Sequence, residues 1–230
     1  MWYPLYAFLD PTYLMLVPVI ILGFYAQWKV RATYKKYAQV AAAAGLSGSK
    51  VAAQLLQQEN LGGVGLEEVG GTLTDHFDPR SNTLRLSAGV ARSASIAAYG
   101  VAAHEVGHAV QRRDGYAFLK IRNTILPVAN IGSQLFIPLL IGGFIFRWGF
   151  LINIGIALYA FAVAFQLVTL PVEFDASRRA LVMLRGTGAV APEEVAGARK
   201  VLSAAALTYV ATTLTAVTWL IFLLIGARRS

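Results

Sequence analysis

The pentapeptide His104-Glu105-Val106-Gly107-His108 combines the residue types and the spacing of a zinc site that hydrolyses peptide bonds. Residues four apart lie on one face of a helix, so both imidazoles can bind one zinc ion at about 2.0 to 2.1 Å. Zinc makes its bound water acidic, and Glu105 can take the proton as this water attacks a polarised carbonyl, then return it to the leaving amine. The alternative is a helix that merely carries two solvated histidines. The motif predicts a zinc-dependent endopeptidase with one zinc ion per chain and Glu105 as general base.

A catalytic zinc ion needs a third protein ligand and an open fourth position. The chain has no cysteine, and the residues after His108 lack the glycine and histidine of the longer three-histidine motif. A carboxylate is therefore expected. Glu173 and Asp175 follow an apolar stretch directly, where an acid is costly unless it has a partner. They are candidate ligands, although an interfacial acid paired with Arg178 or Arg179 would give the same pattern.

Two further side chains are candidates for contact with the substrate. His76 lies between Asp75 and Asp78 at the end of a predicted strand, where it could contact the substrate or the oxyanion. A hydrogen-bonded turn histidine explains its position equally well. Tyr209 lies in an apolar stretch and could donate to the oxyanion, but an ordinary membrane tyrosine is the simpler interpretation.

The composition indicates that these residues are positioned by a membrane protein. With 57% hydrophobic and 14% charged residues, the chain is too apolar for an ordinary soluble domain. Four stretches are long enough to cross roughly 30 Å of hydrocarbon at about 1.5 Å per residue. They are Pro11–Trp28, Asn123–Phe146, Phe150–Val172 and Val201–Gly226.

The polar remainder predicts one small unit with helices and strands. Ser47 to Glu59 has the apolar spacing of a helix, and the Ala-rich segment Ile96 to Ala103 favours a helix leading into the motif. Val64 to Ser87 alternates as a β-hairpin does, with Asp78 to Asn82 as its turn, and its edge could pair with an extended substrate. The expected fold is a mostly α membrane protein, with about four transmembrane helices and a small cytoplasmic α+β zincin-like unit.

The orientation follows from the basic residues. Twelve lysines and arginines lie from Lys29 to Arg122 and five from Val172 to Lys200, against three at Arg147, Arg228 and Arg229. This distribution puts the two large polar segments and the active site in the cytoplasm, although Arg228 and Arg229 fall on the other side. Five regions are expected: an N-terminal anchor (1–28), a metalloprotease region (29–122), two transmembrane helices (123–172), a loop with the third ligand (173–200) and a C-terminal helix (201–230).

Five segments resemble the YugP-like family, the multi-pass neutral zinc metallopeptidases of bacteria. The resemblance extends over nearly the whole chain, and the segments together are far more specific than the pentapeptide alone. They are TDHFDP (74–79), LRLS (84–87), HEVGH (104–108), LPVEFDASRRA (170–180) and AAALTYV (204–210).

The resemblance implies zinc ligands at His104, His108 and Glu173, with Glu105 as the base, in a multi-pass protein of the bacterial cytoplasmic membrane. The segment that begins at Glu173 is also similar to the heat-shock type of membrane gluzincin, in which the second glutamate opens a Glu-x-x-Ala-Asp pattern. Ser177 stands here in place of that aspartate. The sequence then does not show which group orients the ring of a histidine ligand, and Asp175 is the candidate for this contact.

The expected partners are the lipid bilayer and polypeptide substrates, mostly membrane proteins, because an anchored site meets these at high effective concentration. A regulatory membrane partner or a homo-oligomer is left open. The net charge of +8 is explained by the cytoplasmic segments, so no nucleic acid is expected. The alternative function is a noncatalytic membrane scaffold or assembly factor with a structural metal site. A transporter is disfavoured, because ionisable residues are nearly absent from the apolar stretches.

Overall fold

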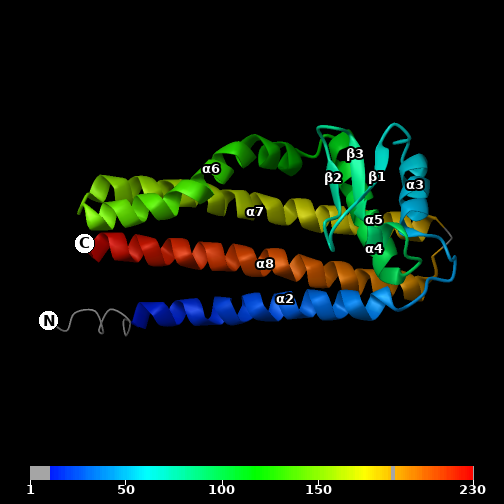
Figure 1. The fold of residues 1–230 in the computed structure, drawn as a ribbon, viewed down its shortest axis with the longest axis horizontal. Coiled ribbons are helices and arrows are strands. Elements are labelled where there is room, and N and C mark those ends of the chain that lie inside the picture. Colours follow the sequence, from blue (N-terminus) through cyan, green and yellow to red (C-terminus); the bar gives the residue numbers. More distant parts are fainter. Residues whose placement is uncertain (1–10, 188–189, 230) are drawn as a thin grey trace. The chain divides into compact units, whose positions relative to one another are not determined.

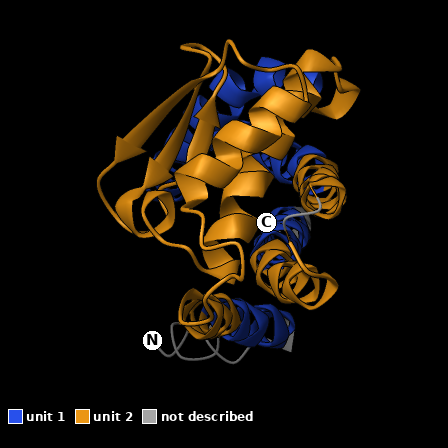
Figure 2. Ribbon diagram, turned by 90° about the vertical axis from the view of Figure 1, so that its right-hand side faces the viewer, with its two compact units in different colours: residues 1–27, 120–170, 208–230 blue, residues 28–119, 171–207 orange. Residues whose placement is uncertain are grey.

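The computed structural model describes residues 11–187 and 190–229, so residues 1–10 of the predicted N-terminal anchor lie outside the described residues. The chain divides into two compact units, coloured separately in Figure 2. Unit 1 comprises residues 1–27, 120–170 and 208–230, and unit 2 comprises residues 28–119 and 171–207. The fold is mostly helical with one small sheet, as predicted (Figure 1).

Unit 1 contains the apolar parts of the long helices. A 3-10 helix, η1 (Pro11–Met15), precedes α2 (Leu16–Ala38), and the other long helices are α6 (Ala117–Ile145), α7 (Gly149–Gly186) and α8 (Pro192–Arg229). These four helical segments are long and apolar enough to cross a membrane, which confirms the expected four spans. Proline lies inside α6 and α7, and α6 bends along its length in Figure 1.

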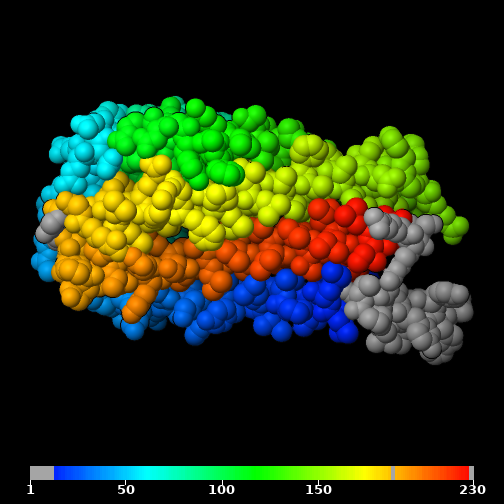
Figure 3. Space-filling model, turned by 180° about the vertical axis from the view of Figure 1, so that it is seen from behind, coloured from blue at the N-terminus to red at the C-terminus, as the bar shows by residue number. Residues whose placement is uncertain are grey.

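Close backbone approaches pack the helices of unit 1. A Cβ atom added to Gly132 of α6 would lie 2.8 Å from the backbone oxygen of Leu158 in α7. In Figures 1 and 3, α8 lies between α2 and α7. A groove is lined by Gly23 of α2, Tyr159 of α7 and Thr212 of α8. Small residues at such contacts are typical of helix packing in membranes, where apolar burial cannot drive association.

Unit 2 contains α3 (Gly48–Gln58), β1 (Gly65–Val69), β2 (His76–Asp78), β3 (Thr83–Ser87), α4 (Ala88–Ala91) and α5 (Ile96–Arg113). The predicted first helix is confirmed as α3, and β2 and β3 form the predicted antiparallel hairpin. The sheet also holds β1, which pairs parallel to β3 and makes the strand order β1-β3-β2. The expectation of a simple hairpin was therefore incomplete. The parallel strand β1 is joined to β3 by a crossover connection, which the local alternation of residues does not reveal.

Helix α5 is the central element of unit 2. It begins at the N-cap Ser95, whose hydroxyl accepts a hydrogen bond from the amide of Ala98 at 3.2 Å. Its apolar face packs in one hydrophobic core with fully buried leucines of α3 and β3, namely Leu55, Leu84 and Leu86. The helix that carries the zinc motif is thus fixed by packing along most of its length.

Candidate metal centre

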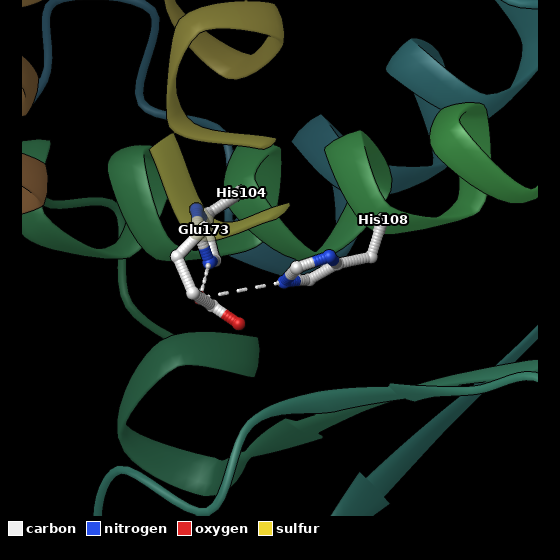
Figure 4. A group of neighbouring side chains, drawn as sticks. All are labelled: His104, His108 and Glu173. Carbon is white, nitrogen blue, oxygen red and sulfur yellow. Dashed lines mark hydrogen bonds and ion pairs between the residues drawn. The ribbon is translucent and has the colours of Figure 1, made fainter. Parts of the chain in front are cut away.

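Three predicted ligands meet between α5 and α7 in unit 2. His104 and His108 extend from one face of α5, and Glu173 of α7 points between them (Figure 4). The Oε2 atom of Glu173 lies 3.3 Å from Nε2 of His104 and 3.7 Å from Nε2 of His108. One ligand atom from each of the three side chains lies within 4.8 Å of the others.

The spacing of these atoms fits a zinc ion. Two tetrahedral ligands at about 2.1 Å from zinc are about 3.4 Å apart, and the two measured distances lie on either side of that value. Two imidazoles and one carboxylate are a donor set that zinc accepts in catalytic sites. Within the described ranges no fourth histidine, cysteine or acid joins the group, and three protein ligands are the number expected of a catalytic zinc site.

Gly107 lets α7 approach α5 closely enough for Glu173 to reach the two histidines. A Cβ atom at Gly107 would lie only 2.6 Å from the backbone oxygen of Ala176, three residues after Glu173 on α7. The chain of α7 continues as an unbroken helix past Val172, where the sequence analysis placed a loop. Glu173 is consequently held by a rigid element and not by a mobile connection.

Each candidate histidine ligand has a polar partner on its Nδ1 atom. Nδ1 of His108 lies 3.0 Å from Oε1 of Gln111, and Nδ1 of His104 lies 3.1 Å from the hydroxyl of Ser177. In the sequence, Ser177 stood out only as a departure from a family pattern, and the contact between Gln111 and His108 was not predicted. The available signal for Gln111 was a polar residue about one helical turn after His108.

Asp175 contacts a histidine ligand only indirectly. Its Oδ2 accepts a hydrogen bond from Nε2 of Gln111 at 3.0 Å and one from Arg179 at 2.6 Å, and Arg178 also pairs with this carboxylate. The ion pairs considered for this acidic segment are therefore made by Asp175, whereas Glu173 faces the histidines.

Glu105 lies on α5 directly after His104, with only 7% of its surface exposed. Its Oε2 accepts a hydrogen bond from the backbone amide of Phe77 in β2 at 3.0 Å. This bond turns the carboxylate toward β2, at the edge of the sheet, and fixes its direction.

The other two candidates, His76 and Tyr209, belong to different units of the chain. His76 is exposed on β2, next to Phe77, and its Nδ1 lies 2.8 Å from the backbone oxygen of Thr74. Tyr209 belongs to the α8 segment of unit 1. A contact of either residue with the oxyanion stays a prediction.

The electrostatics of the site favour a positive ion. Burial of the ring acts to lower the pKa of His108, but the hydrogen bond to Glu173 and the negative charges of Glu105 and Glu173 raise it more. The net pKa of His108 therefore lies above its usual range. The same negative charges that attract a proton to this ring would attract a divalent cation in its place.

Comparison with known proteins identifies the family of this chain. A family model described as "Putative neutral zinc metallopeptidase" matches residues 12–228. The protein named "Putative membrane protease YugP" from Bacillus subtilis (strain 168) is 46% identical over 193 residues, which cover 84% of this chain and 86% of that protein. No solved structure matches the chain. The chain therefore belongs to the YugP-like family, described as "Putative neutral zinc metallopeptidase".

Proposed function

We propose that this chain is a zinc-dependent endopeptidase of the bacterial cytoplasmic membrane, which hydrolyses membrane or membrane-proximal proteins at the cytoplasmic face. The observation that carries the proposal is the position of Glu105. This buried carboxylate follows the ligand His104 directly and is aimed at a strand edge, beside a group of three candidate ligands. A structural zinc site normally has four protein ligands and no use for such a carboxylate.

The proposed roles of the residues follow from their chemistry. His104, His108 and Glu173 would hold the zinc ion, which when bound supplies a Lewis acid for the substrate carbonyl and for water. Glu105 accepts a proton from the attacking water and delivers it to the nitrogen of the leaving amine. The amide of Phe77 holds the Glu105 carboxylate in place between these two transfers.

The edge of β2 is the proposed binding place for an extended substrate. Phe77 directs its amide toward Glu105 of α5, so this side of β2 faces the candidate site and β3 occupies the other side. The Phe77 amide is occupied by Glu105, so an extended polypeptide would lie along this edge without pairing to that amide, and would present its backbone to the reacting groups. His76 precedes Phe77 on the same strand, where it would be close to such a substrate.

Zinc content and proteolysis, measured together, test the proposal. Wild type purified in detergent is expected to hold one zinc ion per chain and to cleave casein or a membrane protein. Glu105→Gln should retain zinc and lose cleavage, and Glu173→Ala should lose zinc. Glu193→Gln, which removes an exposed acid in the first turn of α8, is the matched control and should behave as wild type. A zinc-free wild type, or an active Glu105→Gln, would favour the noncatalytic scaffold.

The proposed orientation can be tested with single cysteines, because the chain contains none. Arg147 lies in the turn between α6 and α7, and Lys50 is exposed on α3 of unit 2. A membrane-impermeant thiol reagent added to intact cells should label Arg147→Cys and leave Lys50→Cys unlabelled until the cells are opened. The reverse pattern would place the site outside the cytoplasm.

A further inference from the structure

Gln111 is a fully buried amide that joins the two helices carrying the zinc ligands. It lies on α5, one turn after His108, and none of its surface is exposed. Its Nε2 donates to the backbone oxygen of Val172 at 2.8 Å and to Oδ2 of Asp175 at 3.0 Å, both on α7. Its Oε1 lies 3.0 Å from Nδ1 of His108.

These contacts allow only one orientation of the amide. The Val172 oxygen is an acceptor, and Asp175, which also accepts from Arg178 and Arg179, is a carboxylate. Only the NH₂ group of Gln111 can satisfy both. Its oxygen must therefore face His108, and because that oxygen can only accept, Nδ1 of His108 must carry the hydrogen. A neutral imidazole with hydrogen on Nδ1 has its lone pair on Nε2, the atom that lies near Glu173.

We propose that Gln111 is a positioning residue that fixes the tautomer and the direction of His108 and connects this ligand to the negative charge of Asp175. The inference rests on the proposed function, because it assigns a role toward the bound zinc ion. Ser177 beside His104 cannot act in the same way, because a hydroxyl can donate or accept and so accepts either tautomer.

The arrangement differs from a direct carboxylate–histidine contact. The amide stands between Asp175 and the ring, so the charge reaches His108 through a neutral group. Loss of an outer partner of a zinc ligand typically lowers metal affinity about 10- to 100-fold. Gln111→Met keeps the side-chain length and removes all three hydrogen bonds, so a loss in that range is expected. Asp175→Asn should weaken zinc binding less.

Zinc affinity, measured by competition with a chelator, tests the inference without reference to proteolysis. Gln111→Met should bind zinc about 10- to 100-fold more weakly than wild type. If Asp175 acts through Gln111, Asp175→Asn should have little further effect in the Gln111→Met background. Tyr116→Phe is the matched control, since it removes a hydrogen bond to the neighbouring backbone oxygen of Pro171 and touches no ligand.

NMR of the histidine ring nitrogens tests the assigned tautomer of His108 on wild type, even where Gln111→Met fails to fold. The chain has only three histidines, and the zinc-bound protein should show hydrogen on Nδ1 of His108. Metal on Nδ1, or a folded Gln111→Met with wild-type zinc affinity, would overturn the inference and leave the proposed function standing. A wild type that binds no zinc would instead overturn the proposed function.

Discussion

Replacement of Gly107 by alanine should separate the two ligand-bearing helices without removing any ligand. The added Cβ atom would lie 2.6 Å from the backbone oxygen of Ala176, whereas carbon–oxygen contacts are normally about 3.3 to 3.6 Å. Helix α7 would have to move by about 0.7 to 1 Å, several times the roughly 0.2 Å tolerance of metal–ligand distances. Because Glu173 lies one turn away on α7, its carboxylate should withdraw from the histidines. A displacement of this size is expected to reduce hydrolysis about 100-fold and to weaken zinc binding.

The matched control is Gly100→Ala on the same helix. At Gly100 the new Cβ atom would lie 3.4 Å from the Cβ atom of Ala198, an ordinary contact, and alanine favours the helix by about 1 kcal/mol. This variant should keep the zinc affinity of wild type and melt at the same or a higher temperature. Overpacking at Gly107 should instead cost about 1 to 3 kcal/mol. Chelator competition and thermal melting of both variants test the reasoning, which fails if Gly107→Ala binds zinc and cleaves as wild type does.

Four further results are expected. Chelation should remove zinc and abolish cleavage in wild type, and added zinc should restore both. In Glu173→Ala, added zinc should restore neither. Ser95→Ala should destabilise unit 2 by about 1 kcal/mol in melting experiments, because α5 loses its N-cap. Leu55→Ala should destabilise it by about 2 to 5 kcal/mol, since Leu55 is completely buried. Hydrogen bonds from Arg85, the Arg80 amide and Ser81 hold the pKa of Asp78 well below its usual range. The stability advantage of wild type over Asp78→Asn should therefore be present above about pH 4 and disappear as the pH falls below that value; an unchanged difference in melting temperature would contradict this.

The membrane helices could be predicted because long apolar stretches carry their own signal. Their ends could not, because α7 and α8 continue into unit 2 with polar and small residues that hydropathy does not register as helix. The residues expected to form a loop after Val172 are helical as far as Gly186 for this reason. The parallel strand β1 was missed because its pairing with β3 depends on a crossover and not on local alternation.

The three candidate ligands could be named from helical spacing and from one costly acid near an apolar stretch, and the structure brings them together. Their partners could not, because Gln111 and Ser177 meet the histidines only where α5 and α7 cross. The crossing depends on Gly107, because a side chain there would collide with the backbone of Ala176, and this contact cannot be seen in the sequence. Asp175 was expected to orient a histidine ring, but its carboxylate accepts a hydrogen bond from the amide of Gln111 and does not contact a ring directly.

The most direct test of the central claim is the cleavage rate of Glu105→Gln at a measured zinc content, with wild type beside it in the same lipid vesicles. Glu105 has no role in holding zinc in this account, so the variant should contain one zinc ion per chain. Its hydrolysis of a membrane-protein substrate should fall by about 100-fold or more, the typical loss when a general base is removed. Full zinc content with unchanged cleavage would contradict the account, because the carboxylate beside the ligands would then take no part in the reaction.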